Sequence, residues 1–216
     1  MSSFLQLPGA VPGLDADVPA HFGRPGAEQR NLGEGRAVVD LGIAGERVQA
    51  IVGAGGIGLR MLGMRADAAA RIPGTRVELP GTLGEGTSRY CVVLVDDAAA
   101  PAALEAGLEP AGMLAWEAER VREVRPRLLR PAPAVDVAHH AVRRLYLEGH
   151  EADLPATGTP VTVEATATRV GTVTTAVRDW EDGPVALAVV RTDVPLTAIL
   201  TVGEFRAAQE EVDRGL

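Results

Sequence analysis

The sequence contains no lysine: all 21 basic residues are arginines, against 29 acidic residues, for a net charge of −8. Without lysine the chain has no Schiff-base nucleophile, no phosphate-loop lysine and no Ser–Lys dyad. Its single cysteine, Cys91, excludes intramolecular disulfides, CxxC redox chemistry and cysteine-rich zinc or iron–sulfur sites. The three serines do not lie in a G-x-S-x-G elbow. Most familiar catalytic machinery is therefore not encoded.

Aromatic residues are also scarce, at 3%, whereas apolar residues make up 46% of the 216 residues. This length suits one or two domains with a core built from small side chains. The acidic balance gives no basic surface for nucleic acid. No apolar run reaches the roughly 18 residues of a membrane helix, and Met1–Phe4 does not resemble a signal peptide. We therefore predict a cytoplasmic protein without nucleic-acid or membrane partners.

The first part of the chain predicts a proline- and glycine-rich arm followed by alternating strands and helices. Residues 1–34 form the arm, with a short helical stretch at Ala27–Arg30. The apolar runs Ala37–Leu41 and Arg47–Val52 predict strands. From Ile57 to Ala68, apolar residues recur at helical spacing and predict a helix.

The next segments predict one buried strand and two helices. Arg89–Val95 is almost continuously apolar, as in an interior strand. Residues 98–106 are alanine-rich and predicted helical. Leu114, Ala118 and Val121 place an apolar stripe along one face of a second helix. Every second residue of Arg130–Ala134 is proline, which predicts a stiff linker between two domains.

After the linker the apolar period changes to two. Val161–Thr168 alternates between apolar and polar residues, as in a half-buried strand, and Gly171 predicts a bulge. Asp182–Pro184 is a turn leading into the strand Val185–Val190. These short strands predict a small antiparallel barrel. Glu204–Arg214 is predicted to close the chain as a polar helix.

The whole chain is thus predicted to have an α+β fold. The expected parts are the arm (1–34), an α/β domain (35–130), an antiparallel β-barrel (136–203) and a C-terminal helix (204–216).

A literal G-x-G-x-x-G occurs at Gly53–Gly58, between the predicted strand and helix, and Glu78 follows Gly58 by twenty residues. This arrangement is typical of dinucleotide sites, in which glycines let the backbone approach a pyrophosphate. The alternative is a glycine-rich turn without ligand, favoured because only one βαβ unit can be identified. An NAD(P)-binding oxidoreductase therefore remains an alternative function.

Five arginines gather at one end of the second predicted helix: Arg120, Arg122, Arg125, Arg127 and Arg130. Spacing pairs Glu119 with Arg122 and Glu123 with Arg127, which favours a solvated, self-paired face over an anion site.

Other candidate groups favour structural roles. His139, His140 and His150 lack metal-ligand spacing with any cysteine, so no metal site is predicted. Cys91 is predicted to be buried and unreactive. Asp96-Asp97 is predicted to end a strand and cap the next helix rather than to act as a catalytic pair.

Three segments resemble a known family. The first comprises His21-Phe22-Gly23, Glu28-Gln29-Arg30 and Gly35 to Leu41. The second runs from Pro110 to Val121 and continues in Arg125-Pro126-Arg127-Leu128. The third comprises Gly158 to Val161, Arg169 to Val173 and Gly183 to Arg191. Together they resemble YgfZ-type folate-binding proteins of the glycine-cleavage T-protein (aminomethyltransferase) superfamily. The Lys-Gly-Cys-Tyr stretch of that family is absent, and the chain is shorter.

The resemblance implies a folate-binding α/β domain followed by a barrel, and a role in iron–sulfur cluster assembly or repair without turnover chemistry. It implies a tetrahydrofolate derivative as cofactor and iron–sulfur proteins as partners. Trp116, Glu117 and Arg120 match the segment beside the folate channel and are the expected ligand-binding residues, and no catalytic residue is expected. A degenerate protein-interaction scaffold is the third alternative.

Overall fold

The computed structural model describes residues 3–13, 17–43, 59–81, 86–125, 139–149 and 153–210. The chain divides into two compact units. The first comprises Met1–Gly81 and Gly86–Glu119, and the second comprises Thr82–Glu85 and Arg120–Leu216. The predicted strand at Arg47–Val52 and the predicted linker at Arg130–Ala134 lie outside the described residues.

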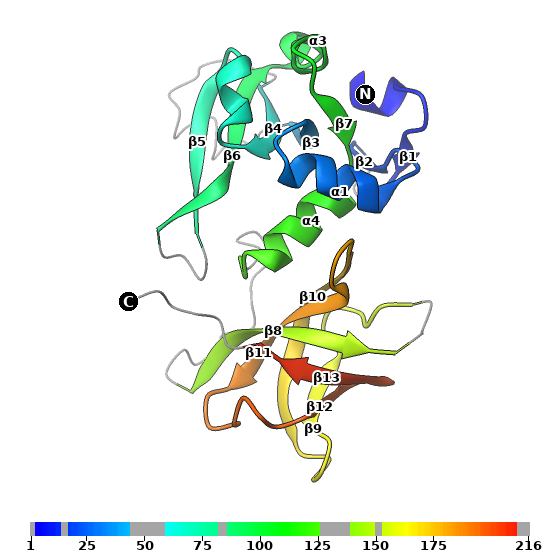
Figure 1. Cartoon of the computed structure of the whole chain (residues 1–216), viewed down its shortest axis with the longest axis vertical. Helices are drawn as coiled ribbons and strands as arrows, with labels where there is room; N and C mark the ends of the chain where they lie inside the picture. The colour runs from blue at the N-terminus through cyan, green and yellow to red at the C-terminus, as the bar shows by residue number, and fades with distance from the viewer. Residues whose placement is uncertain are drawn as a thin grey trace. The chain divides into compact units, whose positions relative to one another are not determined.

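The first unit is built on a five-stranded sheet of order β5-β6-β4-β3-β7 (Figure 1). Its strands are β1 (Val11–Pro12), β2 (Pro19–His21), β3 (Ala37–Ile43), β4 (Leu59–Arg65), β5 (Thr75–Pro80), β6 (Thr87–Asp96) and β7 (Glu109–Ala111). Its helices are α1 (Pro25–Gly33), α3 (Ala102–Glu105), α4 (Met113–Arg122) and the 3-10 helices η1 (Ser3–Gln6), η2 (Ala68–Arg71) and η4 (Asp97–Ala99). The last residues of α4, from Arg120 on, belong to the second unit. Strands β3 and β7 run parallel, and the other neighbours in this sheet run antiparallel.

Most predicted elements of this unit are confirmed. The helical stretch at Ala27–Arg30 lies within α1, and the apolar runs Ala37–Leu41 and Arg89–Val95 lie within β3 and β6. The alanine-rich stretch forms η4 and α3, and the stripe at Leu114, Ala118 and Val121 lies in α4.

The predicted helix from Ile57 to Ala68 is wrong, because Leu59–Arg65 forms strand β4 between β3 and β6. Leu62 and Met64 are fully buried in the core on one face of the sheet. Gly63 points to the other face, where a Cβ would lie 2.7 Å from Cζ3 of Trp116. Because both faces of this strand are covered, its residues are apolar on both sides and imitate helical spacing.

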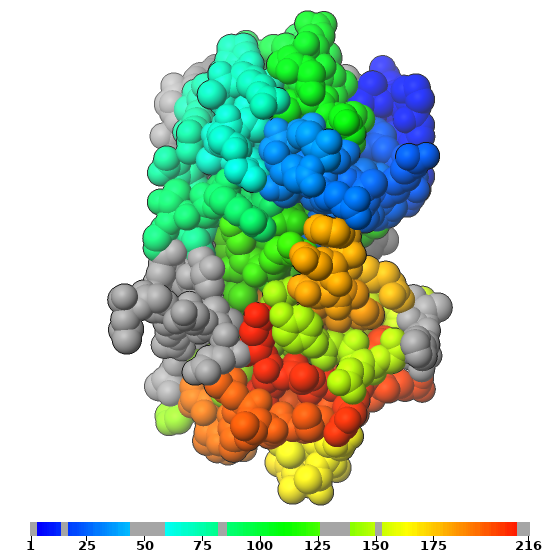
Figure 2. Space-filling view, in the orientation of Figure 1, coloured from blue at the N-terminus to red at the C-terminus, as the bar shows by residue number. Residues whose placement is uncertain are grey.

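The predicted extended arm contains folded structure around α1. Glu28 of α1 accepts hydrogen bonds from the backbone N–H groups of Phe22 at 2.8 Å, Arg24 at 3.0 Å and Gly112 at 3.0 Å. Arg65 of β4 also donates to the carbonyl of Gly33 at 2.9 Å. Figure 2 shows α1 in blue beside the cyan segment that follows β4. The N-terminal segment is therefore part of the first unit.

The second unit contains a closed six-stranded barrel of order β10-β11-β8-β13-β12-β9. Its strands are β8 (His140–Glu148), β9 (Pro160–Val163), β10 (Arg169–Asp179), β11 (Gly183–Arg191), β12 (Leu200–Val202) and β13 (Phe205–Gln209). All its neighbouring strands are antiparallel. The predicted α+β fold with a small antiparallel barrel is therefore confirmed.

Two predictions for this unit need correction. The strand predicted over Val161–Thr168 ends at Val163, where a tight turn follows and Ala167 adopts a positive φ of 52°. The helix predicted over residues 204–216 is wrong at Phe205–Gln209, which forms β13 and pairs with β8 and β12. Phe205 and Ala207 belong to the barrel core, so burial at every second residue decides for a strand. The predicted bulge at Gly171 is confirmed by a register shift against β9.

Candidate functional site

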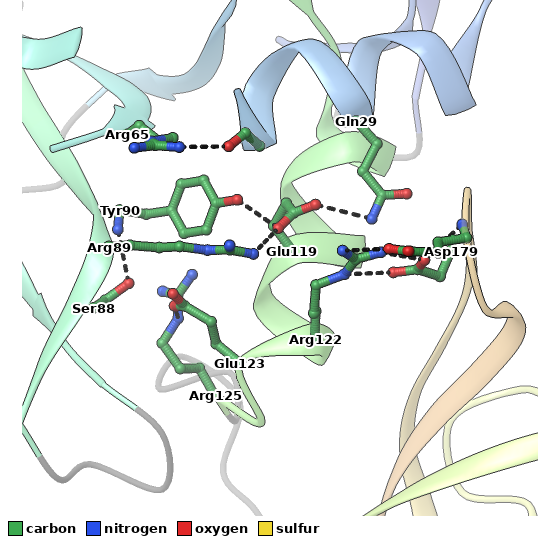
Figure 3. A network of polar contacts seen from close by, with 12 residues as sticks. Gln29, Arg65, Ser88, Arg89, Tyr90, Glu119, Arg122, Glu123, Arg125 and Asp179 are labelled. Atoms are coloured by element: carbon green, nitrogen blue, oxygen red, sulfur yellow. Dashed lines mark hydrogen bonds and ion pairs between the residues drawn. The ribbon is translucent and has the colours of Figure 1, made fainter. Parts of the chain in front are cut away.

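The carboxylate of Glu119 is the centre of a buried polar cluster in the first unit. Its Oε1 accepts from Nε2 of Gln29 at 3.0 Å, and its Oε2 accepts from Nη2 of Arg89 at 3.0 Å and from the hydroxyl of Tyr90. Figure 3 shows these side chains converging from α1, β6 and α4. Glu119 is only 1% exposed, so its charge depends on these donors.

Trp116, one of the three predicted ligand-binding residues, packs in the core beside this cluster. It is 7% exposed, and its ring meets that of Tyr90 edge to face, with centroids 5.9 Å apart. Gly63 leaves the space for the indole, as described above. The structure therefore gives Trp116 a packing role between α4 and the sheet.

The other two predicted residues, Glu117 and Arg120, lie three positions apart on α4 and are 8% and 5% exposed. Nη2 of Arg120 donates to Oγ1 of Thr175 at 2.8 Å, and Nη1 donates to the backbone carbonyl of Arg125. Helical spacing puts Glu117 and Arg120 on one face.

The prediction of a solvated, self-paired arginine face is wrong. Arg122 binds Asp179 through Nε at 3.1 Å and Nη2 at 2.6 Å, and its Nη1 contacts Glu181 at 3.2 Å (Figure 3). Arg125 is buried, with Nε 2.7 Å from Oε2 of Glu123. Arg127 and Arg130 lie outside the described residues. Arg122 thus finds its carboxylates by tertiary contacts, which helical spacing cannot reveal, whereas Arg125 contacts a carboxylate two residues away.

A second buried charge network, unanticipated from the sequence, joins β3 to β4. Nη1 of Arg60 donates to both oxygens of Asp40 at 2.9 Å, and Nε donates to Asp97. Burial opposes the charge of Arg60, but the hydrogen bonds to the two carboxylates outweigh it and raise its pKa. Asp97 is thus bound by Arg60, and β6 ends at Asp96 as predicted, but the side chain of Asp96 makes no capping hydrogen bond to the helix that follows. The sequence did contain a signal for this pair: Asp40 and Arg60 are each a charged residue within an otherwise apolar segment.

The remaining candidates do not form a reactive centre. Cys91 is buried in β6, as predicted, and burial raises the pKa of its thiol. Within the described ranges, no group of three or more His, Cys, Asp or Glu side chains is placed to hold a metal ion. No helix in the described part of the chain has the length and apolarity needed to cross a bilayer.

The dinucleotide motif loses its structural context. Gly53–Gly58 lies outside the described residues, but the segment that follows it is strand β4, antiparallel to β3. A dinucleotide site needs a helix at this position, with its N-terminus toward the pyrophosphate. The predicted strand–turn–helix unit is therefore wrong.

No family model matches the sequence. No curated protein matches it either. Among solved structures, the chain is similar to the glycine cleavage system aminomethyltransferase T from Bartonella henselae, with a TM-score of 0.44 and 14% identity. The similarity covers 71% of this chain and 59% of that chain, which is less than two thirds of the other protein's length.

Proposed function

We propose that this chain is a reduced-folate-binding accessory protein of the YgfZ type, without turnover chemistry, and that α4 provides its ligand contacts. One observation carries the proposal: Glu117 and Arg120, opposite charges on one face of α4, are both more than nine-tenths buried. Burying charged groups is costly, and proteins retain them where they are paired or serve recognition.

The chemistry of a reduced folate suits these two side chains. The pterin edge donates hydrogen bonds, which the carboxylate of Glu117 accepts. The glutamate tail carries carboxylates, which a guanidinium binds as a planar fork. Arg120 now donates to a hydroxyl and a backbone carbonyl. A ligand carboxylate is a stronger acceptor for a guanidinium than a hydroxyl or a backbone carbonyl.

Trp116 has a supporting role in this proposal. Its indole is fixed against Tyr90 and over Gly63, which fixes the rotation of α4 about its axis. Glu119 on the following turn is held by three donors from α1 and β6. The helix that carries Glu117 and Arg120 is thus held rigidly, as a preorganised binding site requires.

The test is calorimetric titration of 5-formyltetrahydrofolate into the wild-type chain, Arg120→Ala and Arg206→Ala. We expect Arg120→Ala to weaken binding by about ten- to a hundredfold, from the loss of one hydrogen bond to a charged group. Arg206 lies on the exposed side of the barrel, paired with Glu164, and its removal should leave affinity unchanged. Equal affinity in all three proteins would remove Arg120 from the site.

The accessory role in iron–sulfur metabolism rests on the sequence resemblance and needs a cellular test. In cells from which the gene has been deleted, we expect the wild-type gene to restore the activity of iron–sulfur enzymes. The Arg120→Ala variant should restore this activity poorly. Full restoration by Arg120→Ala, at equal protein abundance, would separate any such role from folate binding.

A further inference from the structure

Arg143 of β8 is a largely buried arginine that forms no ion pair with any of the residues that the structure describes. Residues 143, 145 and 147 share one face of this strand, and Leu145 and Leu147 line the barrel core. Arg143 lies opposite Ala188, also a core residue, in an unbroken register with β11. Arg143 is only 8% exposed. One strand therefore directs a permanent positive charge toward the barrel interior.

The contacts of this guanidinium are with neutral oxygens. Nη1 donates to Oε1 of Gln209, and Nη2 donates to the backbone carbonyl of Arg191 at 3.3 Å. Among the described residues no carboxylate lies within ion-pair distance of Arg143. Asp193 interacts with it only at longer range and is itself bound by Arg191, with Nε 3.0 Å from Oδ1. Burial accordingly lowers the pKa of Arg143, and Asp193 only partly opposes this effect.

Two other buried arginines of the described chain have carboxylate partners. Arg60 binds Asp40, and Arg144, the next residue after Arg143, binds Asp182 at 2.6 Å and Glu210 at 3.2 Å. A buried charge without a compensating partner usually destabilises a fold. Arg143 differs from Arg60 and Arg144 in having no carboxylate at ion-pair distance among the described residues.

Gln209 makes the arrangement rigid. Its amide nitrogen donates to the carbonyls of Pro195 at 2.9 Å and Ala198 at 2.8 Å, which fixes its oxygen toward Arg143. Two of the five N–H groups of the guanidinium are used by Gln209 and Arg191. Nε of Arg143 donates to none of the described residues. The guanidinium is therefore held in place while some of its N–H groups remain unused by the described residues.

We propose that Arg143 binds a small oxyanion from solution, such as a phosphate or carboxylate group, through these remaining N–H groups. Guanidinium donors match the geometry of such groups, and the buried setting strengthens the interaction. The bound anion would supply the negative charge that none of the described residues places at ion-pair distance from Arg143. This site is independent of the proposed folate site, because its contacts all come from β8, β11 and β13 and the segment around Asp193.

The experiment is a titration of inorganic phosphate into the full chain, followed by the ³¹P chemical shift, with acetate in a second series followed by thermal melting. Sodium chloride at equal ionic strength corrects for general salt effects. We expect saturable binding by the wild type and by Arg206→Gln, a matched exposed arginine of the same barrel. Arg143→Gln should weaken binding by about tenfold or more.

Absence of saturable binding to the wild type, or unchanged affinity in Arg143→Gln, would overturn the proposal. If Arg143→Gln does not fold, Arg143→Lys serves in its place, because it keeps the charge but loses the planar fork. Weaker phosphate binding by Arg143→Lys supports the site, and wild-type affinity contradicts it. Because phosphate and acetate are not folates, the result is independent of the outcome of the folate titration.

Discussion

Both carboxylate oxygens of Asp40 accept hydrogen bonds from Nη1 of Arg60, each at 2.9 Å, and both side chains are almost completely buried. Removing one partner leaves the other charge buried without compensation. We therefore expect Asp40→Ala to destabilise the protein by about 3–5 kcal/mol, measured by urea unfolding. The double variant Asp40→Leu/Arg60→Met should recover most of this loss. A loss below about 1 kcal/mol in Asp40→Ala would show that the pair contributes little.

The hydroxyl of Tyr90 donates to the buried carboxylate of Glu119. Tyr90→Phe should lower the free energy of unfolding by about 1.5–3 kcal/mol, the usual range for a hydrogen bond to a charged group. Arg89 contacts the same carboxylate but its side chain is 47% exposed, so Arg89→Ala should cost only about 0–1 kcal/mol. Equal losses in the two variants would contradict this ranking.

Position 63 requires glycine because the ring of Trp116 lies against it, and not because of its backbone conformation. A Cβ at this position would lie 2.7 Å from Cζ3 of Trp116. Gly63→Ala should therefore destabilise the protein by about 1–3 kcal/mol, through overpacking. Phenylalanine has a smaller ring than tryptophan, so Gly63→Ala should cost less stability in the Trp116→Phe background than in the wild type. Denaturant unfolding of the four proteins measures this coupling, and additive effects would refute the contact.

Cys91 should react slowly with thiol reagents in the native protein. Burial raises the pKa of its thiol, with a smaller opposing effect of Arg76, so less thiolate is present at pH 8 than in an unfolded chain. Labelling by a chromogenic disulfide should be much faster in denaturant than in buffer. Equal rates in the two solvents would mean that Cys91 is accessible in the native state.

Much of the fold could be predicted from local patterns. The apolar run Arg89–Val95 and the apolar stripe on α4 predict β6 and α4 correctly, because buried positions in a strand or on a helix face are occupied by apolar residues. The period-two pattern at Val161–Thr168 correctly indicates a strand, but only as far as Val163. Leu59–Arg65 and Phe205–Gln209 were misassigned because their strands form by pairing with distant segments. Such pairing overrides local helical spacing.

The candidate site was less accessible to sequence reasoning. Glu119 was assigned to a surface pair with Arg122, although it is buried against Gln29, Arg89 and Tyr90, the first of them 90 positions away. A signal was available: Glu119 follows Ala115 by one helical turn, on the buried side of α4. The partners of Arg122 and Arg60 depend on tertiary contacts, which no spacing rule predicts.

Folate binding at α4 is tested most directly by tryptophan fluorescence. The chain has two tryptophans, and Trp180 is 39% exposed, so Trp180→Phe should fold normally and leave Trp116 as the sole reporter. Titration of this variant with 5-formyltetrahydrofolate should quench Trp116 saturably, and Glu117→Gln/Arg120→Ala in the same background should abolish the saturable part. Fluorescence that changes only linearly up to millimolar ligand in the Trp180→Phe protein would contradict the account.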